Sequence, residues 1–469
     1  MPPRYTRLTL ALLLATGLAH ADDFKPAGKN CKVFDYDTLW PAGETHTSSY
    51  QWTGACADGL ATGPGELLAL IDGQLDEDTT GTMEQGRLSG KGSTRFGDGS
   101  QFTGNYAGRR NGQGNLVTPN GLNYQGDFTD GHQTGKGVIT ERNGTRYEGD
   151  FVDGDETGQG IMDIGGQRFE GSFVKGTPTG HIIFTSAKGD RFEGDASLNG
   201  QGKLTFTNGD HYEGDVTGGK PTGKGAYTSA SGVRYEGDFT NHKMTGHGSK
   251  TWPSGDHYEG DMVDGTPEGK GSYTWPDGTR YEGNFVKGKA TGHGSTHYAN
   301  GSHYDGDYSD DQQTGQGVYT AANGDRFEGH FTQGKLNGKG TRLSSNGNRY
   351  EGDFIDSHAT GHGIKTWANG DRYEGEFIDG HRQGKGLFTQ ASGSRYDGDF
   401  ADDKMTGQGT MTGADGTTST GTFVNGQLNG KGVLLSPQGT RFESLFEAGK
   451  PVGKSTITDA NGKAILHWP

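Results

Sequence analysis

The stretch Tyr147-Glu148-Gly149-Asp150-Phe151 is one copy of a motif that recurs about every 23 residues along most of the chain. Other copies run from Tyr235 to Phe239, Tyr281 to Phe285, Tyr350 to Phe354, Tyr373 to Phe377 and Tyr396 to Phe400. A fixed period of this length indicates one supersecondary unit stacked on copies of itself. The sequence therefore predicts an array of repeats and not a globular core.

Each copy is numbered here from its first aromatic residue, position 0, so that Tyr281, Gly283 and Phe285 take positions 0, +2 and +4. Alternation with period two is typical of a strand and places these three residues on one face. Gly292 and Gly294, at +11 and +13, lie in the expected returning strand. Glycine weakens a strand unless something needs the space over its backbone. We therefore expect the rings at 0 and +4 to lie across these glycines.

Asn-Gly pairs such as Asn143-Gly144 and Asn369-Gly370 lie between the predicted strands and would supply the positive φ angles of tight hairpins. The predicted fold class is all-β: tandem β-hairpin repeats that form one elongated, twisted, single-layer antiparallel sheet. About eighteen repeats fit between residues 52 and 463, with Thr79 and Ser419 in place of the aromatic residue. They would span roughly 170 Å before twist.

The pattern Tyr-Glu-Gly-Asp-Phe-x-x-Gly-x-x-x-Gly-x-Gly, seen at Tyr147–Gly160 and Tyr350–Gly363, resembles the MORN repeat. The likeness covers most of the chain and implies an elongated all-β sheet that acts as a scaffold or adaptor, sometimes as a dimer. The resemblance also implies association with membranes or phosphoinositides, which is an older proposal for the family. The chain is identified as an exported, bacterial-type member of this family. Ile182 in place of a glycine, and a contracted spacing near Asn199–Gly202, depart from the pattern and are expected to alter the twist.

Composition agrees with an array. Glycine supplies 89 residues and apolar residues only 28 %, too few for a conventional core. Aromatic residues reach 10 % and stand at regular positions, which argues against disorder. The net charge of -16 makes nucleic acid an unsuitable partner and disfavours anionic membranes.

Both ends of the chain differ from the repeats. Residues 1–21 resemble a signal peptide, with Arg4 and Arg7, an apolar run and Ala19-His20-Ala21 as a cleavage site. This predicts export to a periplasm or to the outside of the cell. Residues 22–51 would form an N-terminal cap, and residues 464–469 a C-terminal cap or tail. Cys31 and Cys56 are predicted to form a disulfide between the N-terminal cap and the first repeat.

Charged residues also recur at fixed positions. Glu dominates at +1 and Asp at +3, whereas Arg or His stands at -1 and Lys at +12. An ion-pair ladder, a cation site and a catalytic carboxylate pair are the three interpretations. The ladder is favoured, because a catalytic pair would normally occur once. His247 with His257, and His293 with His303, are expected to come close, but zinc needs three or four ligands. We predict no catalytic residue, no cofactor and no metal.

Trp252, Trp275 and Trp367 share position +17, just before a hairpin tip. Two interpretations are open: cover for the next ring, or a binding surface for a protein or a sugar. The sequence thus favours a non-enzymatic, exported repeat scaffold that binds another protein or a second copy of itself. The alternative is an envelope-surface binder of lipid headgroups or glycans through its tryptophan face.

Overall fold

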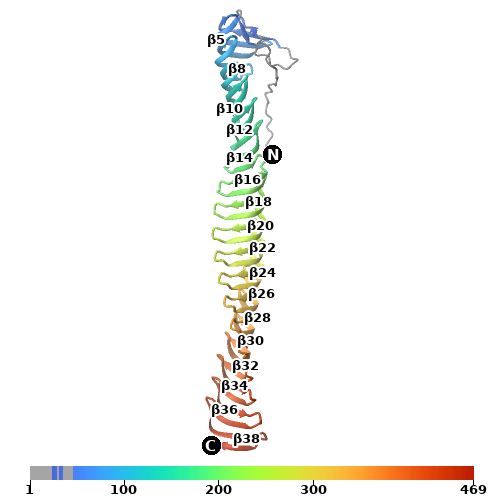
Figure 1. Cartoon of the computed structure of the whole chain (residues 1–469), viewed down its shortest axis with the longest axis vertical. Helices are drawn as coiled ribbons and strands as arrows, with labels where there is room; N and C mark the ends of the chain where they lie inside the picture. The colour runs from blue at the N-terminus through green and yellow to red at the C-terminus, as the bar shows by residue number, and fades with distance from the viewer. Residues whose placement is uncertain (1–23, 29–30, 35–45, 469) are drawn as a thin grey trace. The chain divides into compact units, whose positions relative to one another are not determined.

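The computed structural model describes residues 24–28, 31–34 and 46–468 (Figure 1). The chain divides into two compact units, Met1–Ala230 and Ser231–Pro469, and each is described by itself. The predicted signal peptide, residues 1–21, and the final residue Pro469 lie outside the described residues, as do parts of the predicted N-terminal cap.

Within unit 1 the described residues form the following strands: β1 (Phe24–Pro26), β2 (Lys32–Phe34), β3 (Ser48–Trp52), β4 (Ala55–Ala57), β5 (Leu60–Ile71), β6 (Gln74–Glu84), β7 (Arg87–Phe96), β8 (Gln101–Val117), β9 (Asn123–Thr129), β10 (His132–Thr140), β11 (Arg146–Val152), β12 (Asp155–Ile164), β13 (Gln167–Val174), β14 (Thr177–Thr185), β15 (Arg191–Asp195), β16 (Gly200–Thr205), β17 (His211–Thr217) and β18 (Lys220–Thr228).

The strands of unit 2 are β19 (Arg234–Thr240), β20 (Lys243–Thr251), β21 (His257–Val263), β22 (Thr266–Thr274), β23 (Arg280–Val286), β24 (Lys289–His297), β25 (His303–Ser309), β26 (Gln312–Thr320), β27 (Arg326–Thr332), β28 (Lys335–Leu343), β29 (Arg349–Ile355), β30 (His358–Thr366), β31 (Arg372–Ile378), β32 (His381–Thr389), β33 (Arg395–Ala401), β34 (Lys404–Thr412), β35 (Thr418–Val424), β36 (Gln427–Leu435), β37 (Arg441–Glu447), β38 (Lys450–Thr458) and β39 (Ala464–Trp468).

Consecutive strands pair in antiparallel register along each unit. In unit 1, Gly149 of β11 lies opposite Gly160 of β12 on one side and Gly137 of β10 on the other. In unit 2, Gly271 of β22 lies between Gly260 and Gly283 in the same way. The glycines at +2 and +13 therefore form a row that crosses the strands. The described residues contain no helix, and the predicted all-β fold of tandem hairpins is confirmed within each unit.

The ring at position 0 lies directly on this glycine row. A Cβ added at Gly160 would stand 2.4 Å from the Tyr147 ring, and one at Gly149 would stand 2.6 Å from the Tyr147 hydroxyl. Real Cβ atoms do not approach a neighbour so closely, so both positions need glycine. The Tyr147 hydroxyl also donates a hydrogen bond to the Asp150 carbonyl oxygen at 3.1 Å.

Aromatic rings at 0 and +4 join successive repeats. Tyr373 makes edge-to-face contacts with Phe377 of its own repeat at 5.1 Å and with Phe400 of the next repeat at 4.8 Å between ring centroids. This geometry suits the quadrupoles of the rings. The twelve repeat aromatics singled out by the sequence are all buried, with 0–6 % of their surface exposed.

The glycine at +11 has another role, so the expectation that rings cover it is wrong. Gly158 has a φ of +115°, and the strand register shifts at this point as in a β-bulge. A Cβ at Gly158 would stand 2.7 Å from that of Asp150. The Asp150 carboxylate accepts the backbone N–H of Gln159 at 2.8 Å. Gly at +11 and Asp at +3 therefore build the bulge together.

The tight hairpin turn also lies elsewhere than predicted. At Asn143-Gly144 only the glycine has positive φ, +87°, while the Asn143 side-chain oxygen accepts the Thr145 N–H at 2.8 Å. Two consecutive positive φ angles occur instead at +6 and +7, as at Asp153 (49°) and Gly154 (87°). That pattern is the two-residue turn that fits the twist of paired strands.

Hydrogen bonds link each hairpin to the next at both ends of the strands. At the tight turns, the Gly154 N–H donates to the Gln133 carbonyl oxygen at 2.9 Å. At the longer turns, here called the tips, the Asp371 carboxylate accepts the Ala391 N–H from the next tip at 2.9 Å. Each repeat is thus tied to its neighbour at both ends of its strands.

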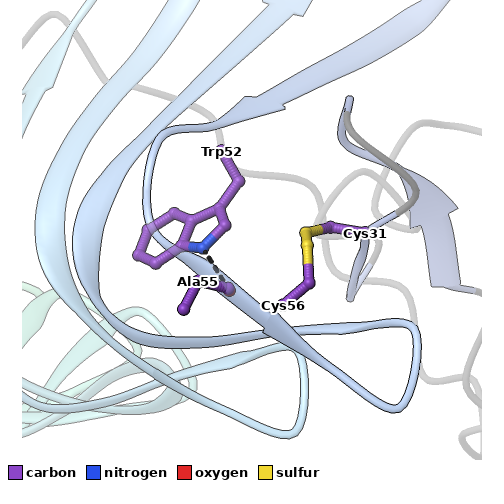
Figure 2. Close-up of a disulfide and its surroundings, with 4 residues drawn as sticks. All are labelled: Cys31, Trp52, Ala55 and Cys56. Atoms are coloured by element: carbon purple, nitrogen blue, oxygen red, sulfur yellow. Dashed lines mark hydrogen bonds between the residues drawn. A yellow bond between two sulfur atoms is a disulfide. The ribbon is translucent and has the colours of Figure 1, made fainter.

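The described part of the N-terminal cap folds onto the first long strand. β4 pairs with the start of β5 and β3 with its end, while β2 meets β5 at Lys32 and Leu60. The predicted disulfide between Cys31 and Cys56 is present, with Cα atoms 5.6 Å apart (Figure 2). Beside it, the Trp52 indole N–H donates to the Ala55 carbonyl oxygen at 3.0 Å (Figure 2).

Candidate binding surface

The two faces of the sheet differ in chemistry. The ring face carries the aromatic residues and glycines, because positions 0, +2, +4, +13 and +15 all point to it. Lys250 at +15 lies opposite Tyr235 and Tyr258, both at position 0, in the two flanking strands. Trp252 follows two residues later and so belongs to the same face. The +17 residues therefore border the ring face along the tips.

Trp252, Trp275 and Tyr298 occupy +17 in three consecutive repeats, and we call these three residues the tip row. Tyr273, at +15, lies between the first two: its ring centroid is 5.8 Å from that of Trp252 and 4.7 Å from that of Trp275. Trp275 is 39 % exposed, whereas the position-0 ring of its own repeat, Tyr258, is fully buried. The tip row thus offers aromatic surface that the fold leaves accessible.

Tyr273 is fixed by a carboxylate at the preceding tip. Its burial, a hydrogen bond with the Asp256 carboxylate and the charge of that group raise the pKa of Tyr273 to about 12. The phenol therefore stays neutral at physiological pH and holds its ring between the two tryptophans.

The third member of the row has different neighbours. The Tyr298 hydroxyl accepts a hydrogen bond from Gln313 Nε2 at 2.6 Å. Its +15 neighbour in the same strand is Thr296, a small buried residue whose hydroxyl bonds that of Tyr308 at 2.6 Å. A small side chain thus stands where the preceding repeat places the Tyr273 ring.

One lysine lies against the tip row. The Lys250 ammonium is 5.0 Å from the Trp252 ring centroid and donates to the Gly265 carbonyl oxygen at 2.7 Å. Burial lowers the pKa of Lys250. This cation–π contact covers part of Trp252 and leaves Trp275 as the most open ring of the row.

Trp367 shares the offset but has a more crowded environment, here called the Trp367 cluster and made of Trp367, Lys365, Arg382, Phe388 and Asp403. The Arg382 guanidinium lies 5.5 Å from the Trp367 ring and 5.3 Å from that of Phe388. It also pairs with the Asp403 carboxylate at 3.1 Å and is only 16 % exposed. Lys365 lies 5.1 Å from the Trp367 ring. Trp367 therefore takes part in local packing.

The indole N–H groups of the tryptophans also differ in whether a protein group accepts their hydrogen bond. That of Trp52 is used within the first repeat, as described above. Across residues 24–28, 31–34 and 46–468, no protein group accepts the indole N–H of Trp252 or of Trp275. Both donors are open to solvent or to a ligand.

The outer face, opposite the rings, carries the charged columns. Lys339 at +12 pairs with Asp353 at +3 of the next strand at 2.7 Å, and this contact lowers the pKa of Asp353. Arg372 at -1 pairs with Glu374 at +1 of its own strand at 2.7 Å. The predicted ladder is present, but most of its arginines pair along a strand; Arg168 also reaches Asp163 across strands, at 3.4 Å. These exposed pairs are each worth little.

The expected histidine pairs, His247 with His257 and His293 with His303, are wrong. The strand register places His247 opposite Asp261 and His303 opposite His297, with the last two rings 5.8 Å apart. In the described part of the chain, no group of three or more His, Cys, Asp or Glu side chains is placed to hold a metal ion. The same residues include no helix that is both long and apolar enough to cross a membrane.

The MORN repeat family model matches fourteen segments that together cover more than half of the chain: 80–101, 124–146, 147–164, 198–211, 212–234, 235–257, 258–280, 281–303, 304–326, 327–349, 350–372, 373–395, 396–418 and 420–441. The chain belongs to the MORN-repeat family. Most of these segments begin at a residue of position 0, so the family's repeat and the observed hairpin coincide. A comparison with curated proteins found no match.

The solved structures that resemble this chain have low TM-scores. The TCP10c domain of Drosophila melanogaster Sas-4 is 14 % identical, over 37 % of this MORN-repeat chain and 93 % of that domain, with a TM-score of 0.20. The TCP10 domain of Danio rerio CPAP, solved with a peptide of STIL, is 12 % identical over 62 % and 95 %, with a TM-score of 0.13. A virginiamycin B lyase from Staphylococcus aureus is 13 % identical over 64 % and 98 %, with a TM-score of 0.11. Scores this low support no argument about function.

Sequence reasoning found the tryptophans but missed their neighbours. No role was predicted for Tyr273, Tyr298, Lys250 or Arg382. All four fall on the ring face, with Lys250 and Tyr273 at +15, Tyr298 at +17 and Arg382 at +9, but this follows only once the register is known. The bulge at +11 hid that register, because it adds two residues to the returning strand: Gly149 and Phe151 lie opposite Gly160 and Glu156.

Proposed function

We propose that this MORN-repeat protein is a non-enzymatic, exported scaffold that binds a protein partner through the ring face of unit 2. The observation that carries the proposal is the tip row, where Trp275 remains 39 % exposed beside the fully buried position-0 rings of Tyr258 and Tyr281. Exposed tryptophan next to well-packed residues is typical of the centre of protein interfaces. The rigid frame beneath it would hold the row ready for a partner.

Export is part of the proposal. The signal-like residues 1–21 support it, and so does the Cys31–Cys56 disulfide, since disulfides persist in oxidising compartments. The expected destination is the periplasm or the outside of the cell. The partner is a different protein or a second copy of this chain.

Affinity capture from the native compartment, with crosslinking and mass spectrometry, tests the proposal. We expect a partner whose crosslinks map to the tips of β20, β22 and β24. A chain that captures nothing and stays monomeric at every concentration would contradict the proposal.

A second candidate is an envelope-surface binder of glycans or lipid headgroups. The tip row favours it, because aromatic rings stack on sugars as well as on proteins. The net charge of -16 and the carboxylates of the outer face disfavour anionic lipids. Polysaccharide pull-down and liposome flotation without retention would exclude this candidate.

A further inference from the structure

The spacing of the tip row suggests what kind of partner it fits. Neighbouring strands lie about 4.8 Å apart, and each repeat contributes two strands, so consecutive +17 rings are separated by about 9.6 Å. A polyproline II helix has three residues per turn and a rise of about 3.1 Å, which gives a repeat of about 9.3 Å. One turn of such a helix therefore matches one step along Trp252, Trp275 and Tyr298.

We propose that the tip row binds a proline-rich segment in the polyproline II conformation, with every third residue of that segment against one ring of the row. The inference rests on the proposed function, since it names the class of protein segment that the ring face would take. Polyproline II ligands dock on aromatic surfaces because their helix is already formed in the free state. Little conformational entropy is then lost on binding.

Hydrogen-bonding chemistry supports this partner. A polyproline II helix has no internal hydrogen bonds, so its carbonyl oxygens all need outside donors. Among the described residues, the indole N–H groups of Trp252 and Trp275 have no protein acceptor. They stand one repeat apart, the same step as one turn of the helix.

The charges beside the tip row indicate which proline-rich segments would bind best. Carboxylates lie at the tips beside the two tryptophans: Asp256 bonds Tyr273, and Asp277 accepts the Thr279 N–H at 2.8 Å. The whole chain carries a net charge of -16. Lys250 lies at the Trp252 end of the row, so a segment that combines prolines with Lys or Arg matches best beside Trp275, and added salt should weaken its binding.

The row stops after three repeats, which limits the length of the segment. The next +17 residue is Ala321, which offers no ring to stack on. At the Trp367 cluster, the +17 residues on either side are Ser344 and Gln390, and Arg382 already covers the Trp367 ring. The tip row, and not Trp367, is the predicted docking site.

The test is a titration of the full-length protein with a fluorescent peptide that has proline at every third position and a terminal arginine. The reference is a shuffled peptide of the same composition. We expect the periodic peptide to bind more tightly. Trp275→Ala should weaken its binding about tenfold or more, while the control Trp367→Ala changes it less than about twofold.

Thermal melts show whether each variant is folded, and Trp252→Ala provides a second variant of the row. Failure of the periodic peptide to bind, equal binding of both peptides, or binding that Trp275→Ala leaves unchanged would overturn the inference. Retention of a soluble β-linked glucan instead of the peptide would also overturn it. The proposed function would survive these results if a protein captured from the native compartment still required Trp252 and Trp275.

Discussion

Trp275 and Trp367 hold the same position in two repeats of unit 2, yet their surroundings differ. Trp275 is 39 % exposed, touches Tyr273 and has no cation recorded over its ring among the described residues. Trp367 faces Lys365 and Arg382, and Arg382 is itself paired with Asp403. The position in the repeat sets where a ring lies. Its +15 and +9 neighbours decide whether that ring packs or remains open.

The two regions share one frame, the position-0 rings packed on the glycine row, and differ in the side chains around their tryptophans. Both regions stand on the same ring-and-glycine row, with Tyr258 over Gly271 in one and Tyr373 over Gly386 in the other. Substitutions in the frame and in the Trp367 cluster should therefore change the stability of the fold. Substitutions in the tip row should change binding.

The largest effect is expected from the frame. Gly271→Ala and Gly386→Ala would each place a Cβ 2.4 Å from a tyrosine atom, and each should lower the free energy of unfolding by about 3 kcal/mol. Urea denaturation measures both. The control Ser272→Ala, on the outer face, should change stability by less than about 0.5 kcal/mol. If Gly271→Ala were as mild as this control, the rings would not depend on bare backbone.

The next effect concerns the Trp367 cluster alone. Arg382→Met keeps the apolar stem but removes the guanidinium from its rings and from Asp403. It should cost about 2 kcal/mol of stability, because the rings lose their cation and the Asp403 carboxylate keeps only His381 and the backbone N–H of residue 382 as partners. Lys335→Met, which removes an exposed lysine paired with Asp356, is the control and should have little effect. Equal melting temperatures for the two variants would contradict a structural role for Arg382.

The two tryptophans should then differ directly. Trp367→Ala should cost about 2 kcal/mol, and Trp275→Ala less than about 1 kcal/mol, because the exposed ring buries less apolar surface. Thermal unfolding of the two variants, measured side by side, tests the difference. Equal losses would mean that the neighbours of these rings do not matter.

The smallest effect is expected on the outer face. Lys385 lowers the pKa of Asp399, so their pair stabilises the fold above the ordinary Asp pKa of about 3.9 and loses that effect as pH falls through the lowered value. Lys385→Gln should therefore cost less than about 0.5 kcal/mol at neutral pH. The difference from the unchanged protein should vanish in strong acid. A difference that persists there would require another cause.

The sequence predicted the frame well, because position 0 and the glycines at +2 and +13 repeat without ambiguity. It also predicted that Cys31 and Cys56 pair. It failed where register matters. The bulge at Gly158 was not foreseen, and the expected contact of His247 with His257 was wrong because β20 and β21 pair with His247 opposite Asp261 and His257 opposite Thr251. The cover of Trp367 by Arg382 could not be foreseen for the same reason, since contacts between repeats depend on register and not on spacing alone.

The central claim is that the tip row binds while the Trp367 cluster packs. The most direct measurement is the amount of partner that a folded Trp252→Ala/Trp275→Ala double variant captures from the native compartment, compared with Trp367→Ala. We expect the double variant to capture almost none although it melts close to the unchanged protein, and Trp367→Ala to capture the normal amount although it melts earlier. Normal capture by the double variant would mean that the tip row is not the binding surface.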